Sequence, residues 1–344
     1  MATTLEQLYA LKIPAVRDLF ITAMQDVVDE ATLEEMIKAI ENNDLETLYQ
    51  ASGFTPVVLN KVIDEIETIY GEAASLTLSE WPKRIKTLYG YKRPLFNIRN
   101  ERVEQDLKKY SSDFVTNITD AVKENLRTTL QEGLARGDNP RQTALNIVGR
   151  VNSSTKKREG GIIGLSTNQL RWSNSARRYL ENLDEKYFEL GLRDKRFDSI
   201  VKKAIADGKK LKKEDVDRLV SAYNKKALKY RGDAIARTET MQSINRAEWA
   251  AISQNIEEGL IKPEQVRKWW DDTADGRTRL SHIDLGKRYN KKNTIAFDEP
   301  FVTSTGSKLL YPGDTSLGAN PRETIHCRCK AQYNVDFVKE FTDE

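Results

Sequence analysis

The chain has 344 residues, and 55 lysines and arginines against 52 aspartates and glutamates leave a net charge of +3. This length exceeds the usual range of a single domain, so we expect more than one. The near balance of charge excludes a strongly basic nucleic-acid binder as a description of the whole chain, but not local basic patches. Two cysteines exclude a fold built on disulfides.

The N-terminus, MATTLEQLYALKIPAV, has no basic segment followed by an apolar run and does not predict a secretory signal. No stretch reaches the roughly 18 uninterrupted apolar residues that a transmembrane helix needs. We therefore expect a protein of a reducing compartment that does not enter a membrane.

The N-terminal part of the chain changes character near residue 80. Apolar residues recur at helical spacing over residues 1–80, which predicts a helical bundle. Residues 81–100 are basic and aromatic, and Pro82, Gly90 and Pro94 interrupt them. This pattern predicts a linker or an extended segment docked on a neighbour.

Residues 101–212 return to helical spacing and form a predicted central helical region. The apolar stripe of its first helix comprises Val115, Ile118, Val122, Leu126, Leu130 and Leu134. Gly137 can end that helix, and Asn139-Pro140 can begin the next.

A basic loop interrupts this region, with Lys156, Lys157 and Arg158 ahead of two glycines. A flexible loop of this kind could contact the phosphates of DNA, because the charged backbone attracts such residues. The alternative is a solvated connector without a ligand. Both interpretations stay open at the level of sequence.

A C-terminal module is predicted over residues 213–344, and it begins with a long helix to about Glu258. One face of the second half of this helix carries Thr238, Gln242, Asn245, Trp249 and Ile252. Polar residues on a face anchored by a tryptophan predict buried polar contacts with another element.

Short strands follow the long helix. Residues 266–270 alternate and are aromatic, 301–303 and 308–311 flank turn residues, and a last strand is expected around 325–333. Helices first and strands afterwards predict an α+β fold, mostly helical, with a small strand-containing C-terminal module.

Both histidines and both cysteines of the chain fall within this module. Imidazole nitrogen and thiolate are ligands that Zn²⁺ prefers, so His282, Cys327 and Cys329 are candidate ligands of a zinc ion. On a strand the two sulfurs would point to one face and His326 to the other.

A tetrahedral zinc site needs a fourth ligand, for which Asp275, Asp284 or water are candidates. Alternatively, the two cysteines fill a small core as apolar residues, and a carboxylate satisfies His282. A disulfide between the two cysteines is disfavoured by its geometry.

The segment before His282 has a turn at Asp275-Gly276, followed by Arg277 and Arg279. These arginines either contact an anion such as phosphate or belong to an internal ion-pair network with Asp271, Asp272 and Asp284. The sequence has no nucleophile elbow, phosphate loop or zinc-protease motif, so no catalytic residue is assigned.

Several short segments follow one another in a specific order: IARTET from Ile235, then Asn245, then KWWDDTADGRTRLSH, EPF, YPGD and HCRC. In this order and spacing the chain resembles the phage Mu F-like minor head proteins, also called phage head morphogenesis proteins. The resemblance covers about residues 100–335. The motif residues are Arg237, Thr238, Glu239, Asn245, Trp269, Asp275, Arg277, Arg279, Pro312, Gly313, Asp314 and Arg328. Members often have Asn where this chain has His326.

The resemblance implies a virion component in several copies inside the head near the portal vertex, present in the host cytoplasm during assembly. It implies a role in capsid assembly, DNA packaging and DNA ejection, with portal, other capsid or scaffold proteins, and non-specifically bound phage DNA as partners. We expect no enzymatic activity. The alternative is a metal-dependent nuclease or toxin-like enzyme, for which Asp271, Asp272, Asp275 and His282 are the candidates.

Overall fold

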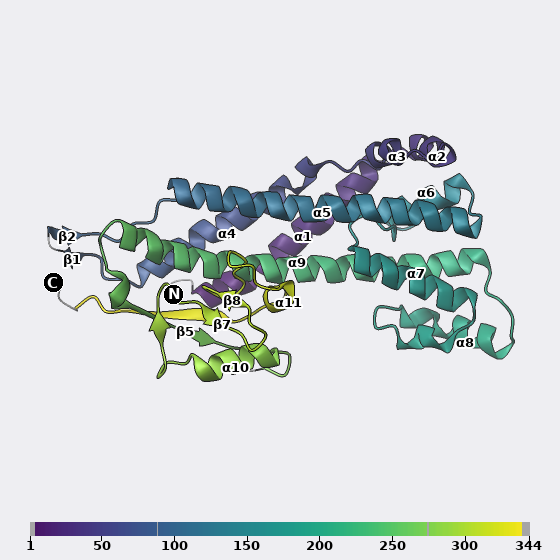
Figure 1. Ribbon diagram of the computed structural model, residues 1–344. Coiled ribbons are helices and arrows are strands. Elements are labelled where there is room, and N and C mark those ends of the chain that lie inside the picture. Colours follow the sequence, from purple (N-terminus) through teal and green to yellow (C-terminus); the bar gives the residue numbers. More distant parts are fainter. Residues whose placement is uncertain (1–3, 88, 274, 339–344) are drawn as a thin grey trace. The chain divides into compact units, whose positions relative to one another are not determined.

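The computed structural model describes residues 4–87, 89–273 and 275–338, and it confirms a mostly helical α+β fold with strands in small sheets (Figure 1). The chain divides into two compact units, each made of separate stretches of sequence. The C-terminal unit comprises Met1–Arg17, Val62–Lys109 and Asp233–Glu344, and the middle unit comprises Asp18–Lys61 and Tyr110–Gly232. The division into segments 1–80, 81–100, 101–212 and 213–344 stays a prediction.

Helices dominate both units. The α-helices are α1 (Leu5–Glu30), α2 (Leu33–Glu41), α3 (Leu45–Ala51), α4 (Asn60–Ser79), α5 (Glu101–Arg136), α6 (Pro140–Val148), α7 (Thr167–Glu181), α8 (Asp198–Ala206), α9 (Lys213–Glu257), α10 (Leu280–Arg288) and α11 (Pro321–Thr324). Short 3₁₀ helices cover Pro56–Leu59, Glu185–Glu189, Lys195–Phe197 and Pro263–Gln265. None of the helices in the described part of the chain has both the length and the hydrophobicity that crossing a bilayer requires.

The strands are short and pair antiparallel. They are β1 (Ile85–Thr87), β2 (Gly90–Lys92), β3 (Arg150–Val151), β4 (Arg158–Glu159), β5 (Val266–Asp271), β6 (Ile295–Ala296), β7 (Phe301–Val302), β8 (Lys308–Leu309) and β9 (Lys330–Val335). β5 is the centre of a three-stranded sheet in the order β6-β5-β9, and the other strands form hairpins. The predicted β7–β8 hairpin is confirmed by the pairing of Phe301 with Leu309.

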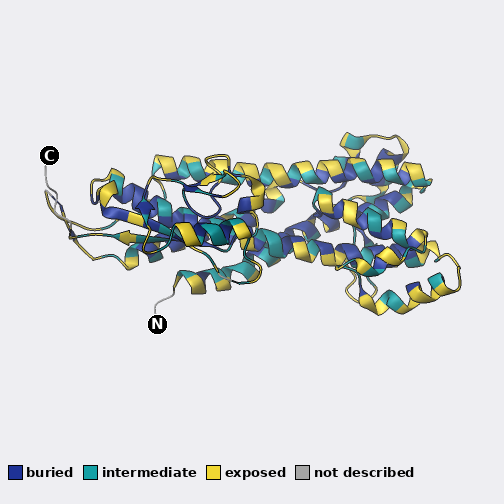
Figure 2. Ribbon diagram, turned by 60° about the horizontal axis from the view of Figure 1, so that its bottom comes forward, coloured by how far each residue is buried: buried dark blue, intermediate teal, exposed yellow. Residues whose placement is uncertain are grey.

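In the middle unit, α5 buries the predicted apolar stripe from Ile118 to Leu130. Figure 2 shows buried and exposed residues alternating along the long helices. Leu134 was expected on the same stripe, but 56% of it is exposed. The inward position of this last turn is Gly133, which is so close to Thr143 on α6 that a side chain would collide with it. The stripe therefore ends where α6 packs against α5. Asn139 begins α6 as predicted, because its side chain accepts a hydrogen bond from the Gln142 backbone N–H.

The basic loop is ordered as a hairpin of β3 and β4, in which Arg150 pairs with Glu159. The first of the two glycines after it lies directly against α9: a Cβ at Gly160 would overlap the Ser221 backbone, and Gly160 also has φ +77°. A Cβ at Gly161 would instead overlap the backbone of Ile147 and Gly149 at the end of α6. Asn224 on α9 donates to the Gly160 carbonyl at 3.1 Å. Glycine is required here because the backbone approaches the helix closely in a left-handed conformation.

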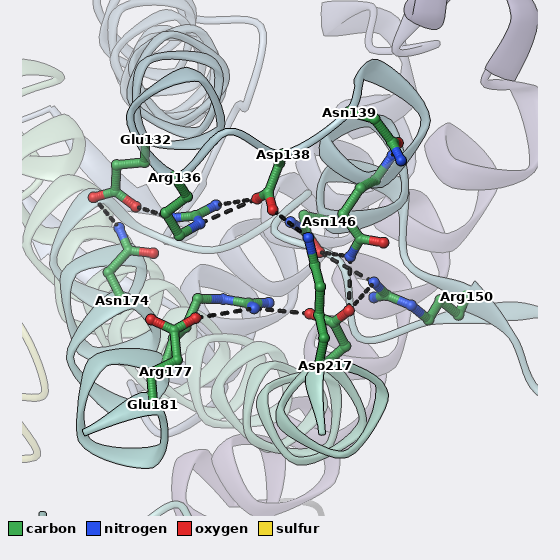
Figure 3. A network of polar contacts seen from close by, with 12 residues as sticks. Glu132, Arg136, Asp138, Asn139, Asn146, Arg150, Asn174, Arg177, Glu181 and Asp217 are labelled. Atoms are coloured by element: carbon green, nitrogen blue, oxygen red, sulfur yellow. Dashed lines mark hydrogen bonds and ion pairs between the residues drawn. The ribbon is translucent and has the colours of Figure 1, made fainter. Parts of the chain in front are cut away.

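A polar network links α5, α6, α7 and α9 within the middle unit (Figure 3). The carboxylate of Asp217 on α9 forms ion pairs with Arg177 at 2.7 Å and Arg150 at 3.1 Å. It also accepts a hydrogen bond from the Gln142 amide at 2.8 Å. Asp138, in the α5–α6 connection, pairs with Arg136 and with Lys213 at 2.6 Å. The side chains of Asp217 and Arg177 are both almost completely buried, so these charges compensate one another away from water.

In the C-terminal unit, residues 81–100 form the β1–β2 hairpin and then an extended stretch. The backbone N–H of Leu95 donates to Asn255 and that of Asn97 donates to Gln254, both on α9. The stretch after the hairpin is thus docked on α9, as the second of the two interpretations of residues 81–100 expects.

A small hydrophobic core lies beside the β6-β5-β9 sheet in the C-terminal unit. It contains Trp270, Leu285, Ile295, Phe301, Tyr311, Cys327, Cys329 and Ala331. β5 and β9 are paired along their whole length, from Val266 with Val335 to Asp271 with Lys330. This core holds α10 and the segment before β9 in contact with one another.

Candidate metal centre

His282 meets both cysteines inside this core. His282 lies in the first turn of α10, and the cysteines lie between α11 and β9. Its Nδ1 is 3.6 Å from the Sγ of Cys327 and 3.4 Å from the Sγ of Cys329. All three residues are buried, with at most 3% of any of them exposed. The structure therefore brings together all three ligands that were predicted from the sequence.

Glu323 on α11 contacts the other nitrogen of the imidazole. Its Oε2 lies 3.0 Å from His282 Nε2. Ser281 and Thr305 donate hydrogen bonds to the same carboxylate at 2.8 and 2.7 Å. These hydroxyl groups and His282 keep the pKa of Glu323 below its usual value although burial opposes them. An ionised Glu323 favours the proton on Nε2, which leaves the lone pair of Nδ1 facing the two sulfurs.

Glu323 was not identified from the sequence. The sequence predicted a carboxylate partner for His282 only in general terms, as part of the metal-free alternative. Glu323 and His282 are far apart in the chain, and only the packing of α11 against α10 makes them neighbours.

The predicted strand over residues 325–333 is wrong in its first half, because β9 begins only at Lys330. His326 has φ +59°, a left-handed conformation that breaks an extended chain. Its backbone N–H donates to Thr238 Oγ1 on α9 at 3.0 Å. The two sulfurs thus face the same imidazole because of a turn at His326. Their common direction is not the result of side-chain alternation along a strand.

The two thiols influence each other. The pKa of Cys327 is lowered, mainly because the neighbouring Cys329 thiol donates a hydrogen bond to it. The pKa of Cys329 is raised well above its usual value by the interaction with Cys327 and by burial. Without a cation, the first of the two thiols therefore loses its proton more readily than the second.

Asp275 and Asp284, the carboxylates considered as a fourth ligand, do not join this group. Asp275 receives Arg328 in a two-pronged contact, with both distances 2.6 Å, and this pairing holds the pKa of its carboxyl well below the usual range. Asp284 pairs with Arg288 at 2.9 Å. In the described part of the chain, the ligand atoms of His282, Cys327 and Cys329 all lie within 4.8 Å of one another.

The predicted polar face of α9 is confirmed by its contacts with the rest of the C-terminal unit. Thr238 accepts from His326, and Gln242 donates to the Gly313 carbonyl at 2.7 Å. Asn245 donates to the Cys329 carbonyl at 3.1 Å and accepts from the Ala331 N–H at 3.3 Å. These side chains bind backbone on both sides of the cysteine pair, so α9 fixes the segment that carries the sulfurs.

The remaining motif residues shape the same unit. Asp314 is buried and receives the N–H groups of Leu310 and Ser316, which closes the turn that contains Pro312 and Gly313. Trp269 lies on β5 opposite Gln332. The other members differ in exposure: Arg237 and Arg277 are exposed, and Glu239 is partly buried.

Arg279 and Arg277 do not form one anion site. Arg279 donates to the carbonyl of Ile325, in the turn ahead of the cysteines. Arg277 lies beside Asp275, whose carboxylate accepts a hydrogen bond from the Arg277 backbone N–H at 3.0 Å. Both arginines therefore have internal partners, but these differ from the predicted Asp271, Asp272 and Asp284: Arg277 lies beside Asp275, and Arg279 donates to a backbone carbonyl.

The candidate DNA-contact residues belong to the middle unit and lie apart from these motifs in the sequence. Lys156 and Lys157 are exposed in the turn between β3 and β4. Arg158 is partly buried and donates to the Gly149 carbonyl at 3.4 Å. Of the three residues, the two lysines present their side chains to solvent.

Residues 195–332 match the model of the family described as phage Mu protein F like protein. No curated protein and no solved structure matches the chain. The matched range contains α9, the His282, Cys327 and Cys329 group, and all the motif residues that carried the resemblance. Over residues 195–332 the chain is thus similar to the phage Mu protein F like family, which supports the resemblance noted in its sequence.

Proposed function

We propose that the chain is a minor head protein that acts in phage head morphogenesis, without an enzymatic activity of its own. The family match over residues 195–332 is the observation that carries this proposal. The protein would be part of the virion, inside the head near the portal vertex, in several copies. It would take part in DNA packaging and ejection through its partners.

The contacts of the motif residues support a structural role. The carboxylates of Asp275 and Asp314 are both engaged by donors within the unit, and His282 is buried between Glu323 and the cysteines. Hydrolysis by a metal-dependent nuclease would need carboxylates and an open metal position at a cleft. The motif residues instead stabilise turns and join α9 to the sheet.

For portal or scaffold partners, the β1–β2 hairpin offers an exposed aromatic surface. Tyr89 is 91% exposed and Tyr91 is 70% exposed, and Leu95 just beyond the hairpin is 67% exposed. Largely exposed aromatic side chains are typical of surfaces that bind another protein.

Co-purification with the portal protein or with procapsids tests this assignment. We expect the wild-type chain to bind and Tyr89→Ser/Tyr91→Ser to bind at least tenfold more weakly. Tyr230→Ser, at another exposed tyrosine, is the matched control and should bind normally. Absence of any association between the wild-type chain and portal or procapsid would refute the proposed function.

Incubation of plasmid with the protein and Mg²⁺, Mn²⁺ or Zn²⁺ tests the enzyme alternative. Cleavage by the wild type that is lost in His282→Ala would favour that alternative.

For packaged DNA, Lys156 and Lys157 provide two exposed cations at the tip of a hairpin. Each phosphate that a protein neutralises contributes about 0.9 to the slope of log affinity against log salt on duplex DNA. Lys156→Gln/Lys157→Gln should reduce this slope by up to about 2. Lys209→Gln/Lys210→Gln, an exposed lysine pair elsewhere in the middle unit, is the matched control. Equal slopes for the wild type and Lys156→Gln/Lys157→Gln would remove DNA contact by this hairpin.

A further inference from the structure

We propose that His282, Cys327 and Cys329 bind one Zn²⁺ ion, that Glu323 orients the imidazole, and that water completes the coordination. This inference is independent of the proposed function, because it rests on the geometry of the C-terminal unit alone. The ion would fasten α10 to the segment that precedes β9.

The separations of the three ligand atoms fit a single zinc ion. Zn²⁺ holds sulfur at about 2.3 Å and imidazole nitrogen at about 2.0–2.1 Å, and in a tetrahedral site these lengths place nitrogen and sulfur about 3.5 Å apart. The observed distances from His282 Nδ1 to the two sulfurs are 3.6 and 3.4 Å. Both cysteines are free of disulfide bonds, so both sulfurs are available as thiolates.

The contact with Glu323 is the arrangement that supports a metal-binding histidine. A histidine that binds zinc usually passes its second N–H to a carboxylate, which fixes the ring and makes the ligating nitrogen more basic. Glu323 takes this position at Nε2, and Ser281 and Thr305 hold its carboxylate in turn. A core filled by two apolar cysteines would not require an imidazole nitrogen aimed at both sulfurs.

The charges of the group also match a dication. Two thiolates cancel the two positive charges of the ion, so the buried complex of metal and sulfurs is neutral. Binding of a metal to a thiol releases the thiol proton, so the ion itself stabilises both sulfurs as thiolates. The site lies 1–3% exposed, where an uncompensated charge would be strongly unfavourable.

The position of the site in the fold indicates what the ion does. Thr238 binds the backbone of His326, and Asn245 binds that of Cys329 and Ala331, so α9 already holds one side of the group. The ion would join the other side, α10, to the same segment. Its expected role is therefore structural: removal should loosen α10 and residues 324–331 before the rest of the unit.

Metal analysis of the full-length protein, purified without added zinc, tests the proposal directly. We expect about one zinc per chain, and we expect Cys327→Ser and Cys329→Ser to lose it. Glu323→Gln keeps the hydrogen-bonding shape but lowers zinc affinity by about 10–100-fold. His326→Asn, next to the first cysteine, is the matched control and should retain the metal.

Cobalt substitution of the wild type gives a readout that does not depend on the folding of a variant. Tetrahedral Co²⁺ with thiolate ligands produces intense visible bands and sulfur-to-metal charge-transfer absorption in the near ultraviolet. A folded wild-type protein that retains neither Zn²⁺ nor Co²⁺ after loading and gel filtration would overturn the proposal. Full zinc content in Cys327→Ser/Cys329→Ser would overturn it as well.

Discussion

Replacement of Asn245 by alanine should be one of the most damaging single changes in the C-terminal unit. The side chain is fully buried and makes two hydrogen bonds to the backbone of Cys329 and Ala331, on either side of Lys330. Asn245→Ala leaves the Cys329 carbonyl and the Ala331 N–H without this partner. Each buried group left unsatisfied costs about 1–3 kcal/mol. We therefore expect a loss of about 3 kcal/mol in the free energy of unfolding of this unit.

Asn125→Ala in the middle unit is a matched control. Asn125 is equally buried, and its amide donates one hydrogen bond, to the Leu165 carbonyl at 2.7 Å. Loss of this hydrogen bond should lower the free energy of unfolding by about 1–2 kcal/mol. A chain of two compact units need not unfold in a single step, so hydrogen–deuterium exchange resolved by peptide is the appropriate assay. Asn245→Ala should speed exchange in residues 326–335, and Asn125→Ala should leave them unchanged. A cost below about 0.5 kcal/mol for Asn245→Ala, or unchanged exchange in that segment, would refute this reasoning.

Three further predictions follow from the other buried polar groups. Asp217→Ala leaves the buried Arg177 with only the longer 3.8 Å contact to Glu181. It should destabilise the middle unit by about 3 kcal/mol in urea denaturation, and a loss under about 1 kcal/mol would contradict the role of the network. Burial lowers the pKa of Lys268 to about 7, whereas the same amine in the unfolded chain stays protonated up to about pH 10. The free energy of unfolding of the wild type should therefore rise from pH 7 to 10 relative to that of Lys268→Met. The gain is at most about 1.4 kcal/mol per pH unit, and parallel pH profiles would exclude a neutral Lys268. His326→Asn should keep the thermal midpoint, because Asn tolerates the left-handed conformation. His326→Val should lower the free energy of unfolding by about 1–2 kcal/mol and with it the thermal midpoint. Equal midpoints for the two variants would contradict strain at this turn.

The sequence predicted those features that depend on local periodicity. The long helix α9, its polar face and the β7–β8 hairpin all follow from spacing that repeats every three to four residues or from turn residues between short strands. The meeting of His282 with Cys327 and Cys329 was predicted from ligand chemistry, since these residue types share a preference for zinc.

The features that were missed depend on tertiary packing. Residues 325–329 alternate like a strand, but the left-handed backbone of His326 is stabilised by Thr238 on another helix. Glu323 reaches His282 only because α11 lies against α10. The exposure of Leu134 depends on where α6 packs, which the spacing along α5 does not record. In each case a contact between distant segments outweighs the local pattern.

The discontinuous make-up of the two units has a consequence for synthesis on the ribosome. All segments of the middle unit have been made when Gly232 has been added, so this unit can complete its fold while the chain is still growing. The C-terminal unit cannot, because its first segment must wait for its last: Glu6 pairs with Lys330 at 2.9 Å. At about 5–20 residues per second, the N-terminal segment waits on the order of ten seconds or more without its final partners. A chain that terminates before β9 would therefore be expected to contain one finished unit and one exposed, incomplete core.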